Sequence, residues 1–318
     1  MQHRGIVASV ILVLVCYLAW AILASWTEVL ASIAKIGWLG LAFILALSLL
    51  NYWLRFVRWH WYILSLQQHV PYWTDLRCYL AGFALTTTPG KAGEAIRSVL
   101  LSREGVPHSK SLAALLAERL VDVLAVLLIA VLGIVAFPAY SWVAAVIVVG
   151  AVAFLVFIGS ARNRAAMLAW ISRCRFRWIS ERADQLFDWL VHSAELLKLR
   201  RLIPGCALGV VAWGAEAIAF AYIVHMIGYE LSVPLLASIY ALSMLIGAIS
   251  FLPGGLGGAE ASMAVMLVAV GLEGPDVVSA TVVCRLTTLW FAVGLGAVAL
   301  AMSSSAGPIA TVQGKAPQ

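Results

Sequence analysis

The chain has 318 residues, of which 63% are hydrophobic and 11% charged, and its mean hydropathy is +0.99. Soluble domains contain about 25% charged residues, so the composition excludes a soluble globular protein and indicates an all-α polytopic membrane bundle. The net charge is +6, but the basic residues flank apolar segments, where membrane topology and anionic headgroups account for them. We therefore expect no nucleic-acid partner.

Six apolar segments are long enough to cross a bilayer, which takes about 20 residues per helix. They are 5–26, 36–57, 112–137, 141–159, 203–227 and 277–302. We expect one transmembrane domain over residues 1–302 and a disordered tail at 303–318. The first segment is expected to be a retained span, because no small-residue cleavage site follows it.

Two further apolar segments are broken by proline and glycine. Residues 74–101 break at Pro89, and residues 233–270 break at Pro253. Broken backbone at membrane depth is tolerated only where protein buries it or where it lines a wet cavity. We therefore predict two re-entrant hairpins. Their predicted hinge residues are Pro89, Gly90, Gly93, Pro253, Gly254, Gly255 and Gly257.

The distribution of Lys and Arg orients the bundle. With the N-terminus in the cytoplasm, Lys35 lies outside, Arg119 and Arg285 lie within spans, and every other Lys and Arg is cytoplasmic. This bias places both termini in the cytoplasm. Segment 162–201, with an apolar face and an Arg-rich face, is expected on the cytoplasmic surface. Both lipid docking and a plain topological anchor fit this segment.

The two broken segments have similar surroundings. Arg119 follows Pro89 by 30 residues, and Arg285 follows Pro253 by 32 residues, each within the next span. This orientation also requires each broken segment to return to the side that it entered. We infer an inverted repeat, an architecture typical of transporters; ordinary spans kinked by proline and glycine are the alternative.

Charged residues inside apolar segments are expensive and mark candidate functional sites. Lys91 stands at the first break, next to a predicted helix start whose free N–H groups favour an anion. The residues expected to bind an anionic headgroup are Thr87, Thr88, Lys91, Arg97, Arg119 and Arg285. The carboxylates expected to balance them or to carry protons are Glu94, Glu118, Asp122, Glu216 and Glu260. A purely structural ion-pair network is the alternative.

Partners for three carboxylates can be predicted. We expect Glu94 to pair with Lys91, Arg97 or Arg119, and Glu216 and Glu260 to meet Arg285. The aromatic-rich stretch 52–73 lies at a predicted cytoplasmic boundary. We interpret it as an interfacial belt, in which Arg55 and Arg58 could touch headgroups.

Enzyme signatures are missing from the sequence. It has no HExxH, no GxSxG, no metal-ligand cluster and no nucleotide fingerprint. We therefore expect no enzyme, no cofactor and no metal.

Three ordered motifs resemble a known family. They are Thr-Thr-Thr-Pro-Gly-Lys-Ala-Gly-Glu-Ala-Ile-Arg-Ser (86–98), Ser-Leu-Ala-Ala-Leu-Leu-Ala-Glu-Arg-Leu-Val-Asp (111–122) and Leu-Pro-Gly-Gly-Leu-Gly (252–257). The chain resembles the flippase-like, or lysylphosphatidylglycerol synthase transmembrane region, family. Its best-known relatives, the multiple peptide resistance factors, join such a region to a soluble aminoacyl-transferase domain. The sequence departs from the family at 257–260, where relatives often carry a charged residue earlier, and this bears on the role of Glu260.

The resemblance implies movement of a lipid across the bilayer without aminoacyl transfer, since no soluble transferase domain is found in this sequence. We expect an inner-membrane transporter for an anionic phospholipid, a polyprenyl-phosphate or a glycolipid, with a headgroup cavity between the two hairpins. The alternatives are a membrane enzyme acting on a lipid-phosphate and a non-transporting partner of an envelope glycolipid assembly system. The lipid, the transport direction, the energy source and a homo-oligomeric state stay open.

Overall fold

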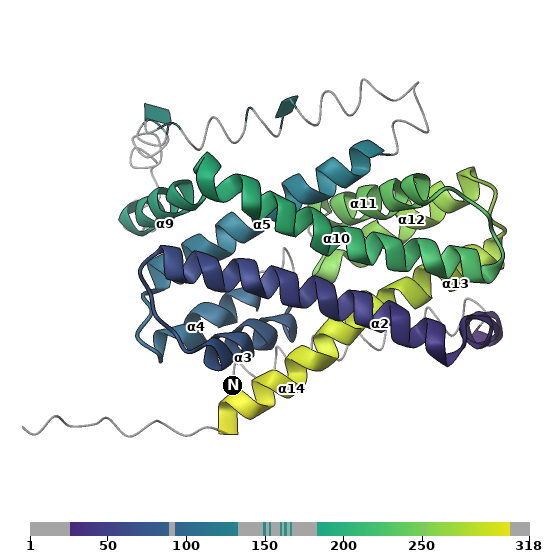
Figure 1. Ribbon diagram of the computed structural model, residues 1–318, viewed down its shortest axis with the longest axis horizontal. Helices are drawn as coiled ribbons and strands as arrows, with labels where there is room; N and C mark the ends of the chain where they lie inside the picture. The colour runs from purple at the N-terminus through teal and green to yellow at the C-terminus, as the bar shows by residue number, and fades with distance from the viewer. Residues whose placement is uncertain are drawn as a thin grey trace, which may run out of the picture.

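The computed structural model describes residues 26–88, 93–132, 183–250 and 252–305, together with 149–150, 153, 160, 162–163 and 166. These residues form helices and turns without a β-strand, which confirms the all-α class (Figure 1). Most of the predicted spans 5–26 and 141–159, most of segment 162–201 and nearly all of the tail lie outside the described residues.

Helices α2 (Trp26–Ser65) and α10 (Leu199–Ile227) lie side by side along the bundle (Figure 1). Gly37 has φ 67° and ψ 171°, so α2 consists of two helices joined at a kink. A positive φ of this kind is cheap only for glycine. The Asn51 side chain donates a hydrogen bond of 2.9 Å to the Ala212 carbonyl of α10. The predicted span 36–57 lies largely after the kink.

The first broken segment comprises α3 (Tyr72–Phe83), a turn and the short helix α4 (Ile96–Ser102). It leads into α5 (His108–Leu132). Lys110 Nζ donates a hydrogen bond of 3.1 Å to the Leu66 carbonyl, which joins the residues before α3 to the start of α5. The broken segment therefore returns to the end of the bundle from which it starts.

The second broken segment comprises α11 (Val233–Ile249), a 3₁₀ turn at Pro253–Gly255 and α12 (Gly258–Ala269). Tyr229 precedes it, and the Tyr229 hydroxyl donates a hydrogen bond of 2.8 Å to Asp276, which follows it. This segment also returns to its own end, opposite the end used by α3 and α4 (Figure 1). The depth of both segments in a membrane stays a prediction.

The last helix of the bundle contains a wide turn. Helix α13 (Gly274–Arg285) continues through a π-helical turn at Leu286–Trp290 into α14 (Phe291–Ser305). The Thr288 hydroxyl donates a hydrogen bond of 2.7 Å to the Cys284 carbonyl beside this turn. Such turns often occur at functional sites.

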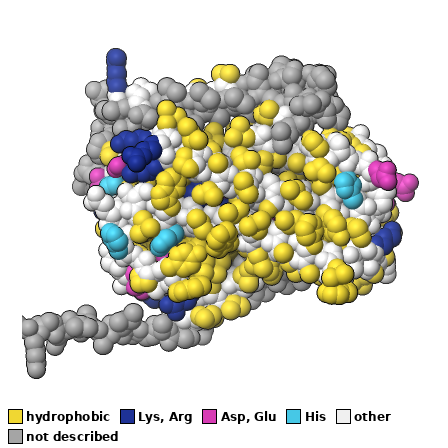
Figure 2. Space-filling view, in the orientation of Figure 1, with side chains coloured by type: hydrophobic (Ala, Val, Ile, Leu, Met, Phe, Trp, Pro, Cys, Tyr) yellow, Lys and Arg dark blue, Asp and Glu magenta, His cyan; other side chains and the backbone are white. Residues whose placement is uncertain are grey.

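Among the described residues, three helices are long and apolar enough to cross a membrane. They are Val29–Ser65, Leu199–Ile227 and Gly274–Ser303. Helix α5 has 25 residues but carries Glu118, Arg119 and Asp122 near its middle. Hydrophobic side chains cover the middle of the visible surface, and most charged side chains lie near its two ends (Figure 2). These features are those of a helical membrane bundle.

The aromatic stretch 52–73 is only partly an interfacial belt. Trp53 and Trp73 are exposed, but Phe56, Trp59 and Tyr62 are fully buried. The interpretation as a belt was wrong for these three residues, because α2 continues to Ser65 and turns them toward the bundle. Part of the predicted surface segment is also packed.

That packed part is helix α9 (Ala183–Leu196), which lies within segment 162–201. The Ser193 hydroxyl donates a hydrogen bond of 3.2 Å to the Ala113 carbonyl of α5, and Leu196 is fully buried. One face of α9 therefore belongs to the protein core.

Candidate functional site

Asp122 connects α5 to two neighbouring helices. Its carboxylate accepts a hydrogen bond from Arg58 of α2, and Arg55 Nη2, also from α2, lies 3.2 Å from Oδ2. Trp213 Nε1 of α10 donates to Oδ1 over 3.2 Å. Arg119 Nη2 lies 3.2 Å from Oδ2.

Glu118 is fully buried and joins the first broken segment to α5. Arg97 Nη1 donates to Oε2 over 2.9 Å, and the Tyr79 hydroxyl donates to Oε1 over 3.0 Å. Arg119 Nη2 lies 2.8 Å from Oε1, and Arg55 Nη2 lies 3.4 Å from it. Buried charges persist only when they are paired and hydrogen-bonded in this way.

Glu94 follows the first break and forms ion pairs with Arg97 and Arg119. Arg97 Nη2 lies 3.0 Å and Arg119 Nη2 3.7 Å from Glu94 Oε2, as the sequence predicts. The Thr86 hydroxyl donates to Oε1 over 3.1 Å. The Arg97 guanidinium also lies 4.1 Å from the centre of the Tyr79 ring, a cation–π distance.

These residues form one network of four arginines and three carboxylates. Its members are Arg55, Arg58, Arg97, Arg119, Glu94, Glu118 and Asp122. Among the four arginines, Arg119 has 24% of its side chain exposed, and the others have 7% or less. Arg119 is therefore the arginine of this network that a ligand can reach most easily.

A second, smaller cluster follows the second break. Arg285 Nε lies 2.7 Å from Glu260 Oε1, and Arg285 Nη2 donates to the Gly254 carbonyl over 3.0 Å. Glu260 Oε2 accepts a hydrogen bond of 2.7 Å from the Gly257 N–H and so caps α12. This is the pair that the sequence predicts for Glu260. The other predicted carboxylate, Glu216, accepts a hydrogen bond from the Tyr240 hydroxyl.

The two clusters share a spacing and a position in the chain. Arg119 follows Glu94 by 25 residues, and Arg285 follows Glu260 by 25 residues. In each case the glutamate follows a broken helix and the arginine lies on the next long helix. The breaks also approach one another, since a Cβ atom on Gly254 would lie 3.4 Å from the Thr87 Cα. The spacing supports the internal repeat that the sequence predicts.

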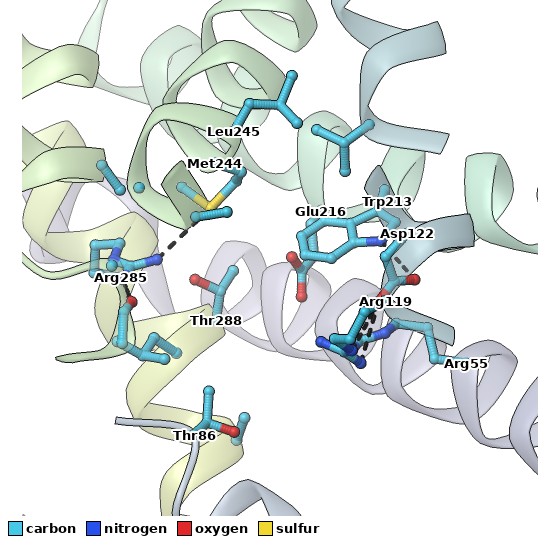
Figure 3. Close-up of a pocket in the computed structure, with 18 of the residues that line it drawn as sticks. Arg55, Thr86, Arg119, Asp122, Trp213, Glu216, Met244, Leu245, Arg285 and Thr288 are labelled. Carbon is cyan, nitrogen blue, oxygen red and sulfur yellow. Dashed lines mark hydrogen bonds and ion pairs between the residues drawn. The ribbon is translucent and has the colours of Figure 1, made fainter. Parts of the chain in front are cut away.

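A cavity of about 430 Å³ lies where the two breaks approach one another (Figure 3). Charged residues of both signs line it. They are Arg55, Glu94, Arg119, Asp122, Glu216 and Arg285. Figure 3 shows Arg285 and Arg119 on opposite sides, with Glu216 and Thr288 between them. The cavity therefore presents both signs of charge inside an apolar bundle.

The predicted site residues fall into three groups. Glu94, Arg119, Asp122, Glu216 and Arg285 line the cavity, with the hinge residues Gly254 and Gly255. The residues of the second group do not line it. They are Thr87, Thr88, Gly93, Arg97, Glu118, Glu260, Pro253 and Gly257. The third group, Pro89, Gly90 and Lys91, lies outside the described residues.

Of the residues expected to bind a headgroup, Thr87, Thr88 and Arg97 do not line the cavity. Arg97 is 1% exposed, and its guanidinium forms ion pairs with Glu94 and Glu118. Thr88 Oγ1 accepts a hydrogen bond of 2.6 Å from the Gly93 N–H and so joins the two sides of the first break. These two residues support the cavity rather than face it.

Sequence reasoning missed Arg55 as part of this site and placed it at the lipid boundary. The structure buries it, at 6% exposure, next to Asp122. Other lining residues that were not predicted are Tyr52, Thr86, Trp213, Tyr240, Met244 and Thr288. A signal was present for Arg55 and Arg58, since both lie within an apolar helix and so need buried partners.

Comparisons with known proteins relate the chain to membrane proteins. A family model described as Lysylphosphatidylglycerol synthase TM region matches residues 6–296. The chain is 27% identical over 237 residues to a UPF0104 membrane protein of Methanothermobacter thermautotrophicus, covering 68% of this chain and 70% of the relative. It is 25% identical over 269 residues to a UPF0104 membrane protein of Pyrococcus horikoshii, covering 76% and 80%. Since the family model matches most of its length, the chain belongs to the lysylphosphatidylglycerol synthase transmembrane region family.

Proposed function

We propose that this chain translocates a lipid with an anionic headgroup, an anionic phospholipid or a lipid-linked phosphate, across the inner membrane without changing it chemically. The observation that carries the proposal is the cavity, which lies where the two breaks approach one another and in which charged residues of both signs meet inside an apolar bundle. Membership of a family named for a lysylphosphatidylglycerol synthase membrane region supports a role in lipid handling.

The charges of the cavity suit a headgroup that must cross hydrocarbon. An ion in a medium of low dielectric constant is costly unless opposite charges surround it. Arg119 offers a guanidinium that is already held by three carboxylates, Glu94, Glu118 and Asp122. A phosphate can form two parallel hydrogen bonds with such a group. Arg285 offers a second guanidinium on the other side of the cavity.

The carboxylates balance the positive charge of the cavity arginines when no lipid is bound. When a phosphate binds at Arg119, it competes with Glu94 and Asp122 for the same guanidinium. Binding can therefore loosen the contact between α5 and the first broken segment. In this proposal the carboxylates stabilise the arginines while the cavity holds no lipid. The proposal also includes the predicted topology, with both termini in the cytoplasm.

The test is translocation in proteoliposomes that contain the purified chain and a fluorescent phosphatidylglycerol. A membrane-impermeant quencher reports how much labelled lipid has reached the outer leaflet. We expect Arg119→Ala and Arg285→Ala each to slow translocation at least tenfold. Arg201→Ala is the matched control, because Arg201 forms an ion pair of 3.5 Å with Glu195, whose side chain is 46% exposed, away from the cavity.

Equal rates for the two cavity variants and the unaltered chain would refute the proposal. Mass spectrometry of the lipid after the assay separates transport from chemistry. Unchanged lipid is expected, and a modified headgroup would instead indicate an enzyme acting on a lipid-phosphate. Cellular function that survives both substitutions, but not removal of segment 162–201, would indicate a partner of an assembly system.

A further inference from the structure

The cavity has an apolar wall in addition to its charged residues. Val123 and Val126 of α5 line it, as do Leu245 and Ala248 of α11 and Leu252 in the second break. Figure 3 shows Leu245 on the side of the cavity opposite Thr86. A site for a water-soluble anion would need no such wall, whereas an amphipathic ligand would use both surfaces.

Two residues of the apolar wall are also exposed on the outside of the bundle. Val123 is 41% exposed and Leu252 is 46% exposed, although both line the cavity. Val126, one turn further along α5, is only 4% exposed and lies deeper. A large apolar side chain that faces both the cavity and the outside marks the rim between them.

The positions of Val123 and Leu252 along apolar helices suit the level of the hydrocarbon. Val123 is close to the middle of α5, a helix of 25 residues, which is about 38 Å long at 1.5 Å per residue. Leu252 lies in the second break, between the apolar helices Val233–Ile249 and Gly258–Ala269. In the proposed function an apolar rim near the middle of these helices faces acyl chains, because a hydrocarbon core is about 30 Å thick.

The size of the cavity also argues for an opening. About 430 Å³ is near the lower end of the range for small-molecule sites, roughly 300–1,000 Å³. It suits a headgroup but does not hold a phospholipid with two long chains. Each buried CH₂ group is worth about 0.8 kcal/mol, so the chains are most stable if they stay in the bilayer while the headgroup is bound.

We propose that Val123 and Leu252 flank a lateral portal, through which the hydrocarbon chains of a lipid extend while its headgroup lies at Arg119. This inference rests on the proposed function and adds where the lipid enters. It also assigns Val123 and Leu252 to chain recognition and Arg119 to headgroup recognition.

The test compares two ligands that share a headgroup. Phosphatidylglycerol with short acyl chains needs the portal, and its deacylated form, glycerophosphoglycerol, does not. Binding of each is measured to the full purified chain carrying Val123→Trp or Leu252→Trp. The matched controls are Val265→Trp and Leu39→Trp, since Val265 is 69% and Leu39 65% exposed and neither lines the cavity.

We expect both portal variants to bind the acylated lipid at least tenfold more weakly and the deacylated headgroup as the unaltered chain does. The controls should bind both ligands normally. The portal is refuted if the variants bind both ligands normally, or if they lose both equally. The proposed function fails separately, if the unaltered chain binds lipid in this pattern but does not translocate it in proteoliposomes.

Discussion

Replacing Glu118 by glutamine tests whether the buried network holds the bundle together. The substitution keeps the shape of the side chain but removes its charge. Glu118 has an arginine nitrogen at 2.8 Å (Arg119), at 2.9 Å (Arg97) and at 3.4 Å (Arg55). The variant leaves four arginines facing two carboxylates in a largely buried place.

Breaking a buried ion pair on one side costs about 3–5 kcal/mol. At about 1.4 kcal/mol per factor of ten, Glu118→Gln should shift the unfolding equilibrium by roughly two to three and a half orders of magnitude. The matched control is Glu195→Gln. Glu195 is 46% exposed and lies 3.5 Å from Arg201, and exposed pairs of this kind contribute about 0–1 kcal/mol.

The measurement is equilibrium unfolding of the purified chain in lipid–detergent micelles titrated with sodium dodecyl sulfate. Tryptophan fluorescence follows the transition. The double variant Glu118→Gln/Arg97→Gln should regain part of the loss, because it removes one arginine together with the carboxylate. If Glu118→Gln falls within 1 kcal/mol of Glu195→Gln, on the scale used above, the network does not stabilise the fold as we argue.

Three further outcomes are expected. Gly82→Ala would place a Cβ atom 2.8 Å from Arg97 Cγ and should cost about 1–3 kcal/mol of unfolding free energy. A Cβ atom on Gly214 would have no neighbouring atom within 4 Å, so Gly214→Ala should be neutral or stabilising by up to about 1 kcal/mol. Equal losses of unfolding free energy in Gly82→Ala and Gly214→Ala would contradict this prediction. A double-mutant cycle of Glu260→Ala and Arg285→Ala should give a coupling energy of about 0.5–3 kcal/mol; a value near zero would show that the 2.7 Å pair contributes nothing. A reporter fused after Gly274 should lie outside the cytoplasm, and a cytoplasmic reporter would refute the inverted arrangement.

Local patterns in the sequence predicted the parts of the site that the chain repeats. Proline and glycine within apolar segments located both breaks, and Arg119 and Arg285 at similar distances after them indicated two related halves. The pair Glu260–Arg285 could be predicted because a buried arginine needs a carboxylate, and Glu260 is the carboxylate next to the second break. These inferences need only spacing and the cost of buried charge.

Long-range packing decided what the sequence did not predict. Arg55 and Arg58 lie in an aromatic stretch near the end of an apolar segment, where hydropathy alone places them at a membrane boundary. Their partner Asp122 is 64 residues beyond Arg58, and no local pattern connects the two. Arg97 was predicted at the headgroup for a similar reason, since its burial depends on Tyr79 and Glu118 from other helices.

The π-helical turn at Leu286–Trp290 has a consequence for insertions and deletions in the last helix. A π turn accommodates one extra residue in an otherwise α-helical stretch, so the helix faces before and after it stay aligned. Deleting one residue within 286–290 should therefore convert the turn to α-helix and leave Arg285 against Glu260. Deleting one residue from the middle of α14 removes no such surplus and rotates the faces on either side of the deletion by about 100°, since an α-helix has 3.6 residues per turn. Residues 286–290, directly beside the cavity, are therefore the place where the chain can lose one residue while the helix faces on either side keep their alignment.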